Sequence, residues 1–295
     1  MFDRIFASYL VQSQLLTEKN LDDIFSCQDK KRVRLGVIAM SEKLMTIDQV
    51  EEVNQEQAVC DKRFGDIAIE KGYLNQEQVS RLLFLQGNVF LAFMQAIIDN
   101  KLLTMAQMDQ ALDKYQKDNS FTLSNMEDLK SCDIDRIIPI FLYEQPALLQ
   151  GLCGVMVRTV SRLVDYHVYI KKPYLSKEFP IHYFCMQELN GEHKMLTSLT
   201  ASGDAMKQAA IGFAGKEYIF NEEDALDALC ELINCVNGLY ATELSIRHIE
   251  MDMDAPHYQQ TDSVLKSQFP FLCLPMVIFQ QEVNLIVSLN SSYTF

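Results

Sequence analysis

The chain has 295 residues, of which 48% are hydrophobic and 22% charged, a composition typical of soluble globular proteins and long enough for two domains. Its formal net charge is −14, which excludes broad nucleic-acid binding because that function needs a basic surface. Binding of a small anionic ligand is still compatible with this charge, provided that basic residues cluster locally.

The first 116 residues contain a repeat with a period of 29 residues. Four segments align, beginning at Ile5, Arg34, Arg63 and Ala92, and each is typical of a short helix, a turn and a second helix. The second helix opens with capping-box spacing in Thr46 and Gln49, Asn75 and Gln78, and Thr104 and Gln107, and with a weaker version in Thr17 and Asn20. One such hairpin cannot bury its apolar face alone, so we expect residues 1–116 to stack as an all-α domain.

The two middle units begin with arginine and glycine: "RLG" places Arg34 and Gly36, and "RFG" places Arg63 and Gly65. A helix N-terminus offers free N–H groups, glycine permits close approach to the backbone, and arginine pairs bidentately with phosphate. Lys30, Lys31, Arg32 and Lys62 add a basic cluster nearby. The tandem arrangement therefore suits a ligand with two phosphates or two nucleobases.

Residues 34–86 resemble the MshEN domain, whose pattern RLGxxLxxxGxLxxxxLxxxLxxQ repeats after a five-residue spacer and which in some members binds cyclic di-GMP. The sequence departs from this pattern at Lys43, where glycine is expected, and at Asn54, Ala39 and Ala68, where leucine is expected. The resemblance implies a nucleotide-binding surface at Arg34, Leu35, Gly36, Gln57, Arg63, Phe64, Gly65 and Gln86, with the outer two units as caps. The alternative is a docking module in which arginine and glycine only cap and solvate helices.

Residues 117–135 are polar without a sustained apolar period, and we interpret them as a linker. The remaining residues, 136–295, alternate helical and strand patterns. We expect helices in 147–163, 204–215 and a long segment after Asn221, and strands in 166–172, 181–189, 194–203, 244–251, 272–279 and 283–290. The sequence thus predicts a two-domain α+β protein whose second domain has a mostly antiparallel sheet with long packed helices.

The long helix carries two contrasting faces. Its predicted buried stripe is Ala225, Leu229, Leu232, Ile233, Val236 and Tyr240, and we interpret Asn237 as a boundary residue. A second face gathers Asp227, Glu231, Asn234 and Gly238 at spacings of three and four residues. Glu231 and Asn234 together suit the anchoring of an ammonium group and the orientation of a water molecule, and Gly238 leaves room for a partner backbone.

Glu231-Leu-Ile-Asn234, followed by Gly238, resembles the ExxN signature of the CheC/CheX/FliY phosphatases of bacterial chemotaxis, over residues 137–295. The first predicted helix of this region, residues 147–163, has no second ExxN motif. In this respect the sequence resembles the CheX-like branch of the family. The resemblance implies hydrolysis of the aspartyl-phosphate of a receiver domain such as CheY, with Glu231 pairing with the receiver's lysine and Asn234 holding the attacking water. It implies no cofactor of the protein's own, Mg²⁺ supplied with the receiver, docking at Asp227 and Gly238, and a homodimer.

The alternative function is that of a non-catalytic adaptor that binds receiver domains or secretion- and pilus-type partners. The eight cysteines have no metal-binding spacing and are expected to be free thiols in a reducing cytoplasm. The apolar stretch 269–279 is too short to span a bilayer and suits a buried strand. The start of the chain lacks a signal-peptide layout, so we expect a cytoplasmic protein without a metal site or a membrane partner.

Overall fold

A computed structural model of the chain describes residues 1–27, 33–59, 62–290 and 292–294. The structure divides into two compact units, Phe6–Cys132 and Asp133–Phe295; of the first five residues, Phe2 groups with the former and the rest with the latter. Within the described residues no single helix combines the length and hydropathy of a membrane span, and α6 with α7 do so only as a pair bent by 88°.

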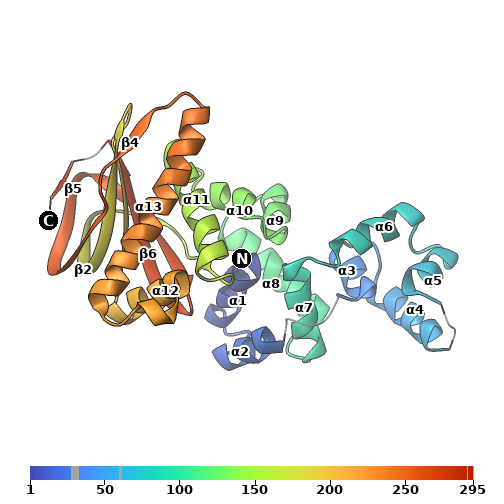
Figure 1. The fold of residues 1–295 in the computed structure, drawn as a ribbon. Coiled ribbons are helices and arrows are strands. Elements are labelled where there is room, and N and C mark those ends of the chain that lie inside the picture. Colours follow the sequence, from blue (N-terminus) through green and yellow to red (C-terminus); the bar gives the residue numbers. More distant parts are fainter. Residues whose placement is uncertain (28–32, 60–61, 291, 295) are drawn as a thin grey trace. The chain divides into compact units, whose positions relative to one another are not determined.

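The N-terminal unit consists of helical hairpins at the predicted period. They are α1 (Phe2–Gln12) with α2 (Glu18–Cys27), α3 (Leu35–Ser41) with α4 (Ile47–Val59), α5 (Phe64–Glu70) with α6 (Gln76–Leu85), and α7 (Val89–Asp99) with α8 (Met105–Asp118) (Figure 1). The second helices start 29 residues apart, and all four predicted caps form side-chain hydrogen bonds. Both the period and the caps are therefore confirmed.

The turn inside each hairpin places one residue in the left-handed region. Gln14, Lys43, Gly72 and Lys101 occupy this position with φ of 57°, 57°, 72° and 55°. Glycine adopts such a φ without steric penalty, whereas other residues do so with some strain. Lys43 thus accepts strain at the point where the MshEN pattern has glycine, and the turn still forms.

The middle two hairpins are joined by a pair of equivalent hydrogen bonds. Gln86 Nε2 donates to the carbonyl of Val33 at 2.8 Å, and Gln57 Nε2 donates to the carbonyl of Lys62 at 3.1 Å. The end of each hairpin thereby holds the start of the other.

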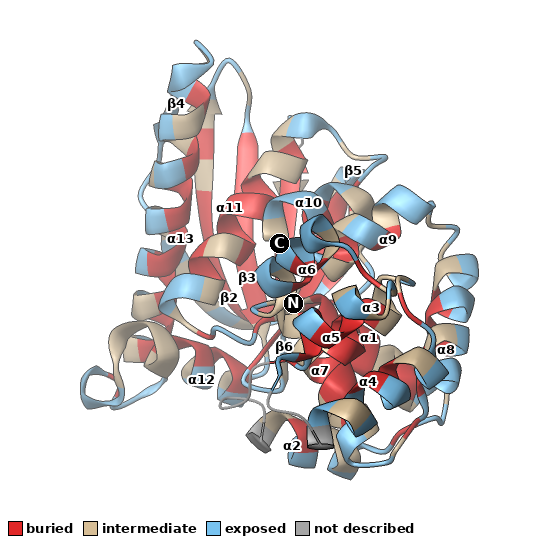
Figure 2. Ribbon diagram, turned by 90° about the vertical axis from the view of Figure 1, so that its right-hand side faces the viewer, coloured by how far each residue is buried: buried red, intermediate tan, exposed pale blue. Residues whose placement is uncertain are grey.

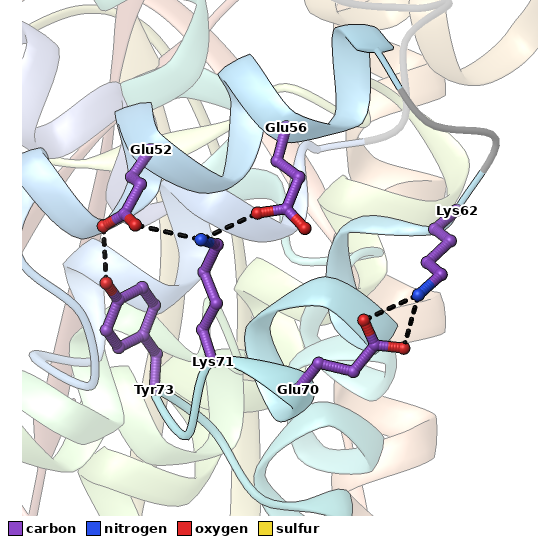
Figure 3. A network of polar contacts seen from close by, with 6 residues as sticks. All are labelled: Glu52, Glu56, Lys62, Glu70, Lys71 and Tyr73. Carbon is purple, nitrogen blue, oxygen red and sulfur yellow. Dashed lines mark hydrogen bonds and ion pairs between the residues drawn. The ribbon is translucent and has the colours of Figure 1, made fainter.

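An exposed polar network adds to the same contact (Figure 3). Lys71 Nζ lies 2.9 Å from Glu52 and 2.7 Å from Glu56, and Tyr73 donates to Glu52 at 2.5 Å. The hydrogen bonds from Tyr73 and Lys71 lower the pKa of Glu52, and the two glutamates raise the pKa of Lys71. The network therefore stays ionised near neutral pH and ties α4 to the turn after α5.

The segment expected to be a linker is largely helical. Helix α8 extends to Asp118, and α9 (Leu123–Lys130) follows with a capping box formed by Thr122 and Asn125. Met126 and Leu129 of α9 are buried. The prediction missed this helix because its apolar face consists of little more than these two residues.

The C-terminal unit has a helical layer formed by α10 (Ile134–Phe141), α11 (Ala147–Leu163), α12 (Gly203–Ala214) and α13 (Glu222–Ile246), with a 3₁₀ turn at Lys216–Tyr218. Helix α11 matches its predicted range, and α13 begins directly after Asn221 as predicted, with a capping box formed by Asn221 and Asp224. Helix α12 begins at Gly203, one residue before its predicted range, and Ser202 caps it. Helices α11 and α13 pack together and lie across the sheet (Figure 1).

The sheet is antiparallel and comprises β1 (Tyr169–Ile170), β2 (Tyr174–Gly191), β3 (Met195–Ala201), β4 (Met251–Met253), β5 (His257–Ile278), β6 (Gln281–Leu289) and β7 (Tyr293–Thr294). The order is β1-β5-β6-β3-β2-β4, and β5 also pairs with β2. The pairings β2–β3–β6–β5–β2 therefore close on themselves. Residues of these four strands, among them Phe184, Leu265, Phe271 and Ile286, form a buried apolar cluster.

Three strand predictions need correction. Strand β2 begins at Tyr174 and not at residue 181. Residues 244–251 do not form the predicted strand, because α13 continues to Ile246 and only Met251–Met253 is extended. Strand β5 begins at His257, well before the predicted apolar run. Its first half alternates weakly and is held by β2 rather than by its own pattern.

Candidate functional site

The polar face predicted on α13 lies at the surface. Asp227 and Glu231 are exposed, and Asn234 and Gly238 are half-buried, whereas the predicted apolar stripe is buried throughout (Figure 2). An acidic first turn, Glu222 to Asp224, favours the helix start through the helix dipole. The structure therefore brings the four residues onto one accessible stripe.

Asn234 is held from below by the sheet. Gln187 of β2, which is fully buried, donates from Nε2 to Asn234 Oδ1 at 2.8 Å. The same nitrogen donates to the backbone carbonyl of Asp254 at 2.7 Å. The Asn234 carbonyl oxygen is thus engaged inside the protein, while Glu231 one turn away extends into solvent.

Asn237 does not lie at a boundary, as the sequence suggested, but in the interior. It is fully buried, its Nδ2 donates to Gln187 Oε1 at 2.8 Å, and its Oδ1 accepts from Thr197 Oγ1 at 2.8 Å. Buried amides require such partners because an unpaired polar group is costly in the core. The sequence signal that we overlooked is Gln187 itself, a polar residue within the apolar strand pattern "IHYFCMQEL".

Gly238 has no packing reason within the described chain to be glycine. A Cβ at this position meets only the end of the Met253 side chain, at 3.7 Å, which is an ordinary contact. Glycine in a helix interior is less stable than alanine by about 1 kcal/mol. The exposed apolar side chains of Leu239 and Met253 flank this point at 47% and 42% exposure. A partly apolar surface formed by Leu239 and Met253 therefore adjoins the polar pair.

The predicted nucleotide-binding residues separate into two groups. A cavity of about 680 Å³ lies between the second and fourth hairpins. Its lining includes Arg34, Leu35, Gly36, Gln57 and Phe64, with Ile98, Lys101 and Thr104 from the fourth hairpin. Arg63, Gly65 and Gln86 are not part of this lining. The fourth hairpin is therefore a wall of the cavity and not only a cap.

The glycines of the RLG and RFG motifs have a packing explanation. A Cβ on Gly36 would lie 2.7 Å from Val50 Cγ1, and one on Gly65 would lie 2.9 Å from Val79 Cγ1. Both distances are far below van der Waals contact, so each hairpin needs glycine to close. These glycines consequently do not by themselves indicate a ligand.

The arginines of the two motifs occupy equivalent positions at the starts of their helices. Arg34 and Arg63 are the N-cap residues of α3 and α5, and both are exposed. The Arg34 guanidinium pairs with Asp99, and its backbone N–H donates to Gln95. Lys62 pairs with Glu70 at 2.7 Å. Lys30, Lys31 and Arg32 of the predicted basic cluster lie outside the described residues.

The cysteines that the structure describes are free thiols. Cys153, Cys185, Cys230 and Cys273 are buried, Cys132 is half-buried and Cys235 is exposed on α13. A hydrogen bond with Cys230, together with burial, raises the pKa of the Cys185 thiol. Cys60 and the Cys27 side chain lie outside the described residues.

Comparisons with known proteins give a limited result. No family model matches the chain, and no curated protein does. Similar solved structures include a chemotaxis protein CheX from Desulfovibrio desulfuricans (14% identity, TM-score 0.44, 49% of this chain and 99% of that one). Others are a CheC-like superfamily protein from Shewanella sp. PV-4 (18%, 0.41, 48% and 96%) and the CheX–CheY–BeF3–Mg²⁺ complex from Borrelia burgdorferi (12%, 0.40, 50% and 98%). The similarity spans about half of this chain, and at these values it carries no argument about activity.

Proposed function

We propose that the C-terminal unit hydrolyses the aspartyl-phosphate of a CheY-like receiver domain. The observation that carries this proposal is Asn234, an amide held by a hydrogen bond from the buried Gln187, next to the exposed carboxylate of Glu231. Such a pair supplies positioning and charge complementarity without a covalent intermediate, which suits phosphoryl transfer to water.

Each residue of the face has a role in this reaction. Glu231 pairs with the ammonium group of the receiver's lysine, and Asp227 adds negative charge on the docking side. Asn234 holds the attacking water in line with phosphorus. Gly238 lets the receiver's backbone reach the helix, and Mg²⁺ arrives with the receiver.

The test is the decay of phosphorylated receiver domains with and without the full-length protein. A panel of receivers, labelled with acetyl phosphate or a cognate kinase, is followed by loss of phosphate at catalytic amounts of the protein. Acceleration with turnover supports the proposal. Stoichiometric binding without acceleration on every receiver that binds would instead favour the adaptor alternative.

A second function, binding of cyclic di-GMP by residues 34–86, stays a prediction for the N-terminal unit. The cavity beside Arg34, Leu35 and Gln57 favours it, and the packing role of Gly36 and Gly65 weakens it. We expect modest affinity, in the micromolar range that corresponds to about −8 kcal/mol.

Isothermal titration of the full-length protein with cyclic di-GMP measures this affinity. Arg34→Ala should abolish the heat if the prediction holds, whereas Arg81→Ala should not. Arg81 is the matched control because it is an equally exposed arginine of the same unit, with an ion pair to Glu42. No heat in the wild-type protein at high micromolar ligand would leave the docking-module alternative.

A homodimer through the C-terminal unit is also proposed. The first half of β5 pairs with β2 on one side, and among the described residues its other side is paired only at Lys266 and Ser267, by β7. A long unpaired strand edge tends to be covered in native proteins. Light scattering at tens of micromolar should give twice the monomer mass, and a monomer mass would contradict the proposal.

A further inference from the structure

Four side chains form a continuous hydrogen-bonded chain from the core of the C-terminal unit to its surface. Thr197 Oγ1 donates to Asn237 Oδ1, Asn237 Nδ2 donates to Gln187 Oε1, and Gln187 Nε2 donates to Asn234 Oδ1, each at 2.8 Å. The first three of these residues are fully buried. Only Asn234, the last, reaches solvent.

The direction of this chain is fixed by a backbone atom. The carbonyl oxygen of Asp254 can only accept a hydrogen bond, so the Gln187 atom that lies 2.7 Å from it must be nitrogen. That same nitrogen faces Asn234 and uses its second hydrogen there. The Asn234 atom that meets it must therefore be the carbonyl oxygen, which leaves the Asn234 NH₂ group on the outward side.

We infer that Gln187 is a positioning residue that fixes the Asn234 side chain so that it presents only N–H donors to the docked partner. The inference deepens the proposed function and rests on it for its kinetic consequences. The orientation of Asn234 itself follows from the hydrogen bonds and stands apart from any activity.

This orientation specifies how Asn234 takes part in hydrolysis. An NH₂ group can hold the oxygen of the attacking water or a phosphoryl oxygen, but it cannot accept the proton of the water. The water oxygen forms the new bond to phosphorus, the bond to the aspartate oxygen breaks, and the carboxylate leaves with the electron pair. Both protons of the water stay with the phosphate that is released. Asn234 thus contributes position and a favourable dipole, and no proton transfer.

The hydrogen bonds also tie a second part of the site to the same glutamine. The Asp254 carbonyl follows directly after Met253, whose side chain lies next to Gly238. Gln187 therefore sets both the amide at the centre of the site and the apolar wall at its edge.

The test compares two pairs of variants in the full-length protein. Gln187→Met keeps the length of the side chain and removes every hydrogen bond that it makes. Thr197→Val and Thr200→Val form a milder matched pair: both threonines lie in β3, both are buried, and both hydroxyls donate at 2.8 Å, but Thr200 donates to the carbonyl of Tyr183, outside the chain. Thr197→Val keeps the inference testable if Gln187→Met does not fold.

The kinetic readout is the rate of receiver dephosphorylation at saturating and limiting receiver. Gln187→Met should lower kcat on the order of tenfold to a hundredfold with little change in KM, because misplacement of a positioning group by about 1 Å has an effect of that size. In an Asn234→Ala background the same substitution should have no further effect. Thr197→Val should lower kcat several-fold, and Thr200→Val should leave it unchanged.

A second readout does not need activity. In a protein labelled with ¹⁵N only in asparagine, the side-chain amide of Asn234 is identified by its loss in Asn234→Ala. It should be rigid in the wild-type protein and mobile in Gln187→Met and Thr197→Val, but unchanged in Thr200→Val. A mobile Asn234 amide in the wild-type protein, or unchanged kcat in Gln187→Met, overturns the inference. A rigid amide in a protein that accelerates no receiver would sustain the orientation and overturn the proposed function alone.

Discussion

The Asn234→Ala protein should fold and bind phosphorylated receiver, but should lose the acceleration of dephosphorylation by about a hundredfold or more. Asn234 is the residue that the structure fixes most firmly on the accessible face, because its carbonyl oxygen is held by Gln187. The substitution also leaves one N–H of a fully buried glutamine unpaired. We therefore expect a loss of about 1–2 kcal/mol in the free energy of unfolding, more than an exposed asparagine would give. Receiver decay assays and urea unfolding measure the two quantities.

Two further variants separate catalysis from docking and from local loosening. Glu231→Ala removes an exposed carboxylate, so it should raise KM as well as lower the rate, without loss of stability. Asn190→Ala is the matched control: Asn190 is also half-buried and donates one side-chain hydrogen bond, at 2.8 Å, to Asp254. Its activity should stay near that of the wild-type protein. Full activity in Asn234→Ala would sink the assigned mechanism, and equal losses in both asparagine variants would point to the Asp254 segment instead.

The local parts of this structure follow from local sequence signals. The capping pairs such as Asn75 with Gln78 and Asn221 with Asp224 fix where helices begin, since both partners lie three residues apart in the chain. The accessible face of α13 follows from helical periodicity alone. The hairpins of the N-terminal unit were predictable for a further reason: the same pattern of helix, turn and helix occurs four times at a period of 29 residues.

The parts that the sequence could not predict depend on contacts between distant segments. Gln187 and Asn234 are 47 residues apart, and their pairing requires the register of β2 under α13. Asn237 was interpreted as a boundary residue because its hydrogen-bond partners, Thr197 and Gln187, lie on strands far from it in the sequence. Likewise, Gly36 suggested a ligand-binding site in the sequence. The structure shows instead that a Cβ at this position would clash with Val50, which lies on the other helix of the same hairpin.

Gly238→Ala should stabilise the protein while weakening its interaction with the receiver. The new methyl group would meet only the end of Met253 at 3.7 Å, and alanine is the better helix former, so the free energy of unfolding should rise by about 1 kcal/mol. On the outward side the same methyl group occupies the space through which a partner backbone approaches. We expect KM to rise about tenfold, which corresponds to about 1.4 kcal/mol of lost binding.

The opposite signs make this substitution diagnostic. Damage to the fold would lower both the free energy of unfolding and the affinity for the receiver. A methyl group that only obstructs the docking face would lower the affinity, while the better helix propensity of alanine would raise the free energy of unfolding. Thr242→Ala is the control, because Thr242 lies one turn further along the same stripe, its hydroxyl donates to the Gly238 carbonyl at 2.9 Å, and the substitution adds no atoms. Urea unfolding gives the free energy of unfolding of both variants, and receiver titration gives their KM. Unchanged KM in Gly238→Ala would mean that no partner approaches the helix at this glycine, and docking would then have to be sought away from the Glu231–Asn234 face.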